Sequence, residues 1–438
     1  MRIINYKPRY GILFIFLLSL IVLSSCDFLK IGTISILGDI AEQLIDKAQE
    51  IGTGSASGGG ISNNSGWSHD AKVKINGSGN PVVIWDQYAG EDTGTDSYIY
   101  LKQWNGSLWE ELGGSASGMG ISDSICGAYS SIAINNSGNP VVVWTDRVGV
   151  WDIYIKQWNG SSWEEIGTGS ASGGGISNSY SNSPSVAINN LGNPVVAWAW
   201  DASANSMTEE IYVKQWNGTS WEELGGSASG GGISNNSGRS LCPSLAINGS
   251  GNPVVAWNDN TSGKYEIYIK QWNGTSWEEI GAGSASGVGI SDTSFGLSLS
   301  INSLGNPVVA WNDATSGNYE IHVKQWNGTI WEELGGSVSG EGININCSLV
   351  PSLAINSLGN PVVAYDYVSA VNSYGAKYIK YWDGSNWKEI YNGSASGRGI
   401  IGFSGCNPSL VIDNSDNLII AYEDYSSGNG EIYVRKIK

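Results

Sequence analysis

Residues 301–334 read INSLGNPVVAWNDATSGNYEIHVKQWNGTIWEEL, and this order of residue types returns along most of the chain. Short runs of β-branched and aromatic residues alternate with turns rich in asparagine, glycine and proline. β-Branched and aromatic residues favour strands, whereas these turn residues interrupt them. Together with the short run that precedes it, each copy therefore predicts four short antiparallel strands joined by turns.

The tripeptide Gly-Asn-Pro marks each copy of the repeat. Its proline recurs at intervals of 54 to 59 residues, and Leu418 takes its place in a seventh, less similar copy. The six prolines are Pro81, Pro140, Pro194, Pro253, Pro307 and Pro361. One four-stranded sheet cannot bury both of its faces, whereas seven sheets packed around an axis can. The sequence thus predicts an all-β fold, a seven-bladed β-propeller of four-stranded antiparallel blades, over residues 48–438.

The seventh copy lacks its fourth strand, because the sequence ends at Lys438 directly after the run EIYVRKI at 431–437. An isolated piece of the repeat, EIGTGSASGGGIS, stands at 50–62 and is identical to residues 165–177. We expect the segment AQEIG at 48–52 to pair with 431–437 and to complete the last blade. Such closure removes the exposed strand edges that an open ring would leave.

The hairpin turns give this closure an internal test. In KQWNGTSWEE the four-residue turn sets Trp272 opposite Trp277, which places Lys270 opposite Glu279. The same count pairs a lysine with a glutamate in the other hairpins, and it pairs Arg435 with Glu50 across the proposed closure. Cross-strand pairs of opposite charge contribute roughly 0.2–1 kcal/mol each. The charge pattern is therefore consistent with a ring joined by its two ends.

Residues 1–25 have the pattern of a signal peptide, with a basic start followed by the apolar run GILFIFLLSLIVL. The tetrapeptide LSSC at 23–26 resembles a bacterial lipobox. That resemblance implies cleavage before Cys26 and attachment of lipid to its sulfur, with an ordinary secretory signal as the alternative. A lipidated Cys26 would anchor an exported protein to a membrane of the bacterial cell envelope.

Residues 26–47 are expected to form a tether between this anchor and the propeller. Apolar residues recur at helical spacing from Ile40 to Ala48, and Asp39 can cap the first turn. The pattern predicts a short amphipathic helix at 39–48. It could pack on the propeller or contact the membrane.

Charge and cysteine content restrict the classes of partner. The whole chain has a net charge of −18, and removal of the basic signal segment makes it more negative. No basic patch is visible, so nucleic acid is not an expected partner.

Beyond Cys26 four cysteines remain, Cys126, Cys242, Cys347 and Cys406. We expect free thiols, with a Cys347–Cys406 disulfide as the alternative, and a monomeric protein.

The sequence predicts neither a metal site nor a cofactor. The cysteine spacings fit no metal motif, and no DxDxDG calcium loop occurs. The two histidines, His69 and His322, are too few for a credible Ser/His/Asp constellation. His322 stands where other copies have tyrosine, and we interpret it as a substituted packing residue.

Candidate ligand-binding residues lie near the longer loops, which we expect on one face of the ring. In each copy an aromatic residue follows the marker by four positions, and an aspartate comes within three more. The candidates are Trp85, Asp86, Trp144, Asp146, Trp198, Trp257, Asp259, Trp311, Asp313, Tyr365 and Asp366. Aromatic faces cover the C–H groups of sugars, and carboxylates accept hydrogen bonds from their hydroxyls. In the alternative interpretation the rings fill the space between blades and the aspartates cap turns.

The unit quoted at the outset resembles the repeats of bacterial seven-bladed propellers, both sialidase-like proteins and tryptophan-rich propeller lectins, over residues 48–438. Sialidases carry an aspartate box, Ser-x-Asp-x-Gly-x-Thr-Trp, and three arginines around a carboxylate. Here the hairpin WDGSNW at 382–387 is one residue shorter and lacks the threonine. Of the four arginines beyond the signal segment, Arg435 belongs to the expected closure and the others lie in loops. We therefore expect no enzyme activity.

The lectin-like resemblance implies recognition of carbohydrate through repeated loop sites on one propeller face. With the anchor implied by the lipobox-like segment, we expect a membrane-anchored binding protein at the surface or in the periplasm. Seven similar weak sites in a ring gain avidity for a multivalent polysaccharide. A protein–protein interaction scaffold is the alternative, and a sialidase-like glycoside hydrolase is a more distant one.

Overall fold

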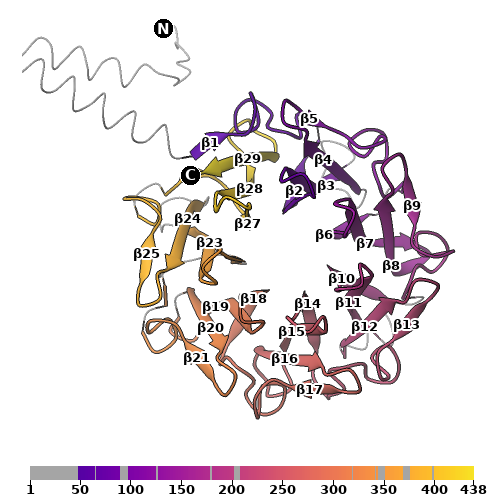
Figure 1. Cartoon of the computed structure of the whole chain (residues 1–438), viewed down its shortest axis with the longest axis vertical. Helices are drawn as coiled ribbons and strands as arrows, with labels where there is room; N and C mark the ends of the chain where they lie inside the picture. Colours follow the sequence, from indigo (N-terminus) through magenta and orange to yellow (C-terminus); the bar gives the residue numbers. More distant parts are fainter. Residues whose placement is uncertain are drawn as a thin grey trace, which may run out of the picture. The chain divides into compact units, whose positions relative to one another are not determined.

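A computed structural model describes residues 48–438, apart from residues 65, 89–96, 125–126, 178–179, 202–207, 318, 341, 344–350, 368–374 and 397–398. In these residues the regular structure consists of strands, which form seven sheets arranged around a central axis (Figure 1). The predicted all-β seven-bladed propeller is therefore confirmed.

Three predicted features of the amino-terminal region lie outside the described residues, namely the signal peptide at 1–25, the tether at 26–47 and the lipidation site Cys26. The predicted helix at 39–48 is not supported, because Ala48 begins a strand and the described residues contain no helix. Consequently, no helix in the described part of the chain could cross a membrane.

The first four blades each contain four consecutive strands. Blade 1 comprises β2 (Ser68–Ile75), β3 (Pro81–Tyr88), β4 (Ser97–Trp104) and β5 (Trp109–Glu110), and blade 2 comprises β6 (Ala128–Ile134), β7 (Pro140–Val148), β8 (Val150–Trp158) and β9 (Trp163–Glu165). Blade 3 comprises β10 (Ser181–Ile188), β11 (Pro194–Trp200), β12 (Glu210–Trp216) and β13 (Trp221–Glu223), and blade 4 comprises β14 (Ser240–Ile247), β15 (Pro253–Asp259), β16 (Glu266–Trp272) and β17 (Trp277–Glu279).

The last three blades follow the same order. Blade 5 comprises β18 (Ser294–Ile301), β19 (Pro307–Asp313), β20 (Glu320–Trp326) and β21 (Trp331–Glu333). Blade 6 comprises β22 (Ser352–Ile355), β23 (Pro361–Tyr367), β24 (Gly375–Trp382) and β25 (Trp387–Glu389), and an additional strand, β26 (Ile401–Gly405), pairs with β24. Blade 7 comprises β27 (Ser409–Ile412), β28 (Leu418–Asp424), β29 (Glu431–Ile437) and β1 (Ala48–Glu50).

The second strand of each blade carries apolar residues on both faces, which explains why the sheets pack side by side. In β15, Val254 and Ala256 join the core shared with blade 5. Val255 and Trp257 point the other way, into the core shared with blade 3. Since successive side chains of a strand point to opposite faces, each sheet needs a neighbour on both sides. Radial packing meets that need for all seven.

The outer hairpins connect each blade to the one before it. The predicted register is confirmed, because Lys270 lies opposite Glu279 in blade 4. The side chains bind other groups, however: Lys270 Nζ donates to the carbonyl of Ile233 at 2.7 Å, and Glu279 accepts the backbone N–H of Gly283 at 2.9 Å. Burial lowers the pKa of Lys270, because it removes water from the charged ammonium group. The hydrogen bond to the carbonyl of the preceding connection partly replaces that water. The lysine and the glutamate thus contribute to stability through their hydrogen bonds to the neighbouring loops.

The first and last described strands meet in blade 7, whose strand order is β1-β29-β28-β27 (Figure 1). The connection that follows β1 is bound to β29: Val434 N donates to the carbonyl of Ser55 at 2.7 Å, and Ile61 N donates to that of Ile432 at 2.9 Å. Glu50 accepts the N–H of Gly54 at 3.0 Å, and Arg435 Nε donates to the Tyr422 hydroxyl at 3.1 Å. That Glu50 lies opposite Arg435 stays a prediction. The expected role of an amino-terminal strand in completing the last blade agrees with this sheet.

Two of the four remaining cysteines can be described. Cys242 and Cys406 are free thiols. Cys406 Sγ donates a hydrogen bond to Glu423 at 3.2 Å, so the alternative of a disulfide to Cys347 is wrong. Cys126 and Cys347 themselves lie outside the described residues.

We predict that closure of the ring can be weakened by one methyl group. Gly60 and Gly58 share a φ of +62°, but a Cβ at Gly60 would overlap the Ile432 carbonyl whereas a Cβ at Gly58 meets no atom within 4 Å. Both alanine variants pay the left-handed backbone cost of about 1–2 kcal/mol. Overlap should add about 1–3 kcal/mol in Gly60→Ala. Thermal unfolding should therefore show a clearly lower Tm for Gly60→Ala, and equal Tm values would contradict the proposed closure.

Candidate functional site

The structure places the predicted aromatic residues inside the propeller. Their exposed fraction is 1% or less in Trp85, Trp144, Trp198, Trp257, Trp311 and Tyr365. Trp311 is typical, because it shares a core with Ala256 and Ile267 of blade 4 and meets His322 edge-on at a centroid distance of 5.6 Å. A ring that is covered in this way has no free face for a sugar. The burial favours the interpretation that these residues fill the space between blades.

The predicted aspartates are buried as well, and three of them hold tryptophan side chains. Asp146, Asp259 and Asp313 accept the indole N–H of the tryptophan two residues earlier, at 2.9, 3.0 and 3.4 Å respectively. The aromatic ring and the carboxylate are therefore brought together as the sequence suggested. This hydrogen bond satisfies the buried indole N–H. It favours the alternative interpretation, in which these residues have a structural role.

Asp86 and Asp366 occupy a different position, one residue earlier in the repeat, and they connect neighbouring blades. Asp86 accepts the backbone N–H of Tyr129 at 2.8 Å, and Asp366 accepts that of Asn407 at 2.9 Å. Burial raises the pKa of Asp86 to about 6. These two carboxylates thus bind the backbone near the start of the first strand of the next blade.

Asp86 also belongs to a group of side chains that could hold a metal ion. His69, Asp70 and Asp86 each offer a ligand atom, and these atoms lie within 4.8 Å of one another. Burial alone would raise the pKa of Asp70, but its hydrogen bond with His69 and the charge of Lys72 lower it to about 2. Asp86 already accepts hydrogen bonds from Tyr129 N and Ser130 Oγ. Because these bonds satisfy Asp86, we assign no metal to this group.

The most suggestive cavity lies in blade 5, where a pocket of about 320 Å³ opens beside β19 and β20. Its walls come from β19, β20, the connection between β17 and β18, and the loop after β21. The polar side chains that line it are Ser291, Asp292, Asp313, Thr315, Ser316, Glu320, His322 and Lys324. One predicted residue pair, Trp311 and Asp313, therefore borders a cavity after all.

The pocket coincides with a departure from the repeat at His322. The other blades have tyrosine at the corresponding place in their third strand, and in blade 4 the Tyr268 hydroxyl donates to the carbonyl of Gly287 at 2.8 Å. Gly340 corresponds to Gly287 in the repeat, and it lines the pocket. Since an imidazole is shorter than a phenol, His322 leaves space where tyrosine would extend to the loop.

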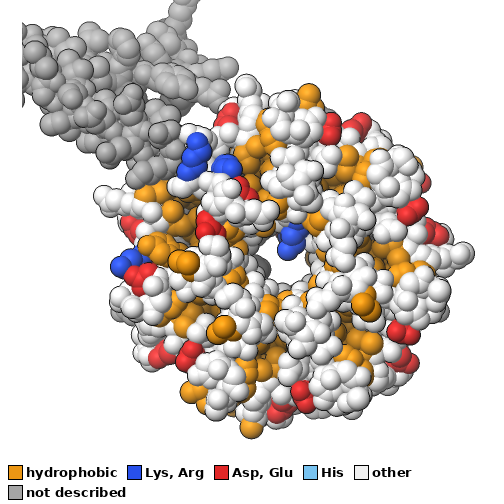
Figure 2. All heavy atoms as spheres, viewed as in Figure 1, with side chains coloured by type: hydrophobic (Ala, Val, Ile, Leu, Met, Phe, Trp, Pro, Cys, Tyr) orange, Lys and Arg blue, Asp and Glu red, His pale blue; other side chains and the backbone are white. Residues whose placement is uncertain are grey.

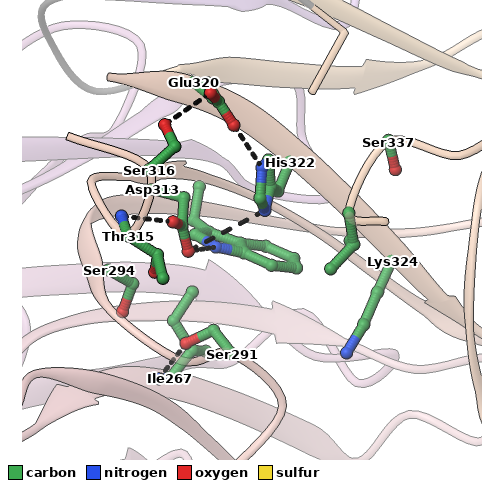
Figure 3. A network of polar contacts seen from close by, with 12 residues as sticks. Ile267, Ser291, Ser294, Asp313, Thr315, Ser316, Glu320, His322, Lys324 and Ser337 are labelled. Carbon is green, nitrogen blue, oxygen red and sulfur yellow. Dashed lines mark hydrogen bonds and ion pairs between the residues drawn. The ribbon is translucent and has the colours of Figure 1, made fainter. Parts of the chain in front are cut away.

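The polar groups around His322 form a connected network (Figure 3). His322 lies between two carboxylates, with Nε2 3.3 Å from Glu320 Oε2 and Nδ1 3.8 Å from Asp313 Oδ2. Ser316 Oγ donates to Glu320 at 2.6 Å, and Thr315 N donates to Asp313 at 2.8 Å. These bonds fix both carboxylates, so the side chains around the pocket are held in place before any ligand binds.

The pocket combines hydrogen-bond acceptors with donors. Asp292, Asp313 and Glu320 supply carboxylate oxygens, while the Lys324 ammonium donates to the carbonyl of Ile290 at 2.8 Å. Burial lowers the pKa of Lys324. A concave site with several fixed polar groups can bind a ligand that has many hydroxyls.

Comparisons with known proteins place the chain by its fold. No known protein family matches its sequence, and no curated protein sequence matches it. Similar solved structures include an ulvan lyase of polysaccharide lyase family PL25, with 11% identity, coverage of 88% of this chain and 95% of that one, and a TM-score of 0.49.

Two glycoside-active neighbours are similar at a comparable level. A Hadza microbial sialidase has 14% identity, coverage of 81% of this chain and 72% of that one, and a TM-score of 0.45. The GH93 α-L-arabinofuranosidase of Fusarium graminearum has 12% identity, coverage of 71% and 93%, and a TM-score of 0.43. Likeness at this level concerns the fold and carries no conclusion about activity.

Sequence reasoning assigned His322 to packing, and that part is correct, because His322 is 6% exposed and lies against Trp311. The pocket beside it was missed. The sequence does contain one sign of the pocket, because His322 is the single replacement of a tyrosine that the other blades share. A smaller side chain at this position leaves a space that tyrosine fills elsewhere.

The glutamate that begins the third strand provides a test of buried charge. Glu210 holds in blade 3 the place of Glu320 in blade 5, and burial raises its pKa to about 7 from 4.5. Between these pH values the unfolded chain has lost a proton that the folded chain keeps, so stability should fall as pH rises. Glu210→Gln should flatten the dependence of Tm on pH between about 4.5 and 7. The exposed control Glu222→Gln should keep the wild-type slope, and an unchanged slope in Glu210→Gln would contradict the raised pKa.

Proposed function

We propose that this protein binds carbohydrate without transforming it, and that the ligand occupies the pocket of blade 5. The observation that carries the proposal is the space beside His322, where a fixed network of carboxylates, hydroxyls and an ammonium replaces the tyrosine of the repeat. A volume of about 320 Å³ lies at the lower end of the range for small-ligand sites, which suits one or two sugar rings.

We place the ligand in one pocket rather than in seven repeated loop sites. The aromatic rings that would have formed the repeated sites are buried. Tyr268 and its counterparts Tyr100, Tyr212 and Tyr433 bridge to a loop glycine in their own blades, and so occupy the corresponding space. The lipobox-like LSSC segment supports attachment of this binding protein to a membrane of the cell envelope.

The charge of the pocket indicates which sugars suit it. Asp292, Asp313 and Glu320 outnumber Lys324, whose ammonium already binds a carbonyl. Carboxylates accept hydrogen bonds from hydroxyl and ammonium groups and repel other anions. The proposed ligand is accordingly a neutral or amino sugar at the end of a glycan.

A protein partner is the second candidate. Three leucines in the tight turns after the first strands are strongly exposed, Leu191 and Leu304 at 81% and Leu358 at 79%. Large apolar side chains on one kind of turn can contribute to a protein interface. This surface is separate from the pocket, so the two candidates predict different effects of the same mutation.

The decisive variant is His322→Tyr, which restores the residue of the other blades. The phenol should reach toward Gly340, fill the pocket and leave the fold intact, because Tyr268 already fits between the same residue types in blade 4. On a glycan array followed by titration calorimetry, we expect at least a tenfold loss of affinity for the neutral or amino sugar that binds the wild type.

Tyr268→His supplies the matched control, since it should open a corresponding space in blade 4. Its binding should equal or exceed that of the wild type. Unchanged affinity in His322→Tyr would overturn the proposed site. Capture of one protein with no glycan signal would favour the scaffold, and release of a reducing sugar from the bound glycan would establish a hydrolase.

A further inference from the structure

The central channel is a second cavity, with a volume of about 310 Å³, and the first strands of the blades line it. Six blades contribute a serine at the same place in this strand, Ser131, Ser185, Ser244, Ser298, Ser352 and Ser409. These side chains form a ring of hydroxyls around the axis.

Each of these hydroxyls binds the next blade through its oxygen. Ser244 Oγ accepts the backbone N–H of Leu299 at 3.2 Å, and Ser409 Oγ accepts that of Val73 at 3.1 Å. The other four serines make the same contact at 2.8–3.3 Å. A hydroxyl that accepts an N–H keeps its own proton for donation. The ring therefore offers hydrogen-bond donors to the channel.

Blade 1 departs from this pattern twice. Lys72 takes the place of the serine, and Lys74 takes a place where most other blades have alanine. Both line the channel, and basic side chains are visible at the central opening next to blade 1 (Figure 2). Two positive charges from one strand thus enter a channel in which Asp70 supplies the one acidic side chain among the described lining residues, the others being polar or apolar.

Neither ammonium group forms an ion pair in the part of the chain that the structure describes, although the charge of Lys72 helps to lower the pKa of the nearby Asp70 carboxyl. Lys72 Nζ donates to the backbone carbonyl of Asp70 at 3.2 Å, while the Asp70 carboxylate lies 3.3 Å from His69. Lys74 has no ion pair or hydrogen bond among the described residues. An uncompensated charge in a confined space gains from binding an ion of opposite sign.

We propose that the central channel binds a small oxyanion, with the Lys72 and Lys74 ammonium groups supplying the charge and the serine hydroxyls supplying hydrogen bonds. Phosphate, sulfate and carboxylate share the required chemistry, because each presents several oxygens to N–H and O–H donors. The net charge of the chain is −18, so these two lysines are an exception to its general character. This site is independent of the sugar pocket in blade 5.

Titration calorimetry on the whole protein in a buffer without oxyanions would test the proposal. Sodium sulfate, sodium phosphate and glucuronic acid are the probes, with sodium chloride at equal ionic strength as the reference. We expect one saturable site for at least one oxyanion. Binding of sulfate or phosphate would indicate a free inorganic ligand, whereas binding of glucuronic acid alone would indicate the acidic group of a sugar. Binding of none of them would overturn the proposal.

The variant Lys72→Ser/Lys74→Ala restores the residues of the other blades and should fold normally. Its affinity for the oxyanion should fall at least tenfold. Lys264→Ser/Lys388→Ala removes the same charge from exposed positions outside the channel and should keep wild-type affinity. An equal loss in both double variants, or no loss in the first, would contradict a site at Lys72 and Lys74. Sugar binding in blade 5 should be unaffected in either case.

Discussion

The structure depends on the fact that each blade has two apolar faces and cannot bury either of them alone. In β15 and β19 all seven residues are buried, because neighbouring sheets cover both sides. Burial of apolar surface is the main favourable contribution to folding, so a blade gains most of its stability from its neighbours. This requirement explains why the last sheet needs a strand near residue 48, and why the ring is closed by its two ends.

Polar contacts between blades follow the same repeat and determine how the blades are spaced. A tryptophan of the outer hairpin donates to the preceding connection, as Trp277 does to Leu224 at 2.9 Å, and a lysine such as Lys270 binds a carbonyl of that connection. On the inner side, serines join successive first strands. The glycine-rich connections accept these hydrogen bonds, and their conformation is therefore fixed by the blades. They have little freedom to rearrange around a ligand.

The two proposed sites share one origin, since both lie where a copy of the repeat has lost a packing residue. His322 replaces a tyrosine that elsewhere closes a space, and Lys72 replaces a serine that elsewhere joins two blades. A framework built from similar units can tolerate such a change in one unit, because the remaining interfaces are preserved. Function in this propeller is therefore expected at the exceptions to the repeat, and its stability at the positions that repeat.

The sequence alone was enough to predict the four strands of each blade, their register and the number of blades, because these follow from local patterns such as the turn that sets Trp272 opposite Trp277. The additional strand β26 of blade 6 was not predicted, since it is not part of the repeat. It also indicated that 48–52 completes the last blade, since only that segment matches the missing strand. Side-chain exposure was decided by the tertiary structure: Trp257 and Trp311 alternate with aliphatic residues equally well whether a neighbouring blade covers them or not. Likewise, the loss of tyrosine at His322 is visible in the sequence, but a pocket arises only because the surrounding strands and loops keep their places when the side chain becomes shorter.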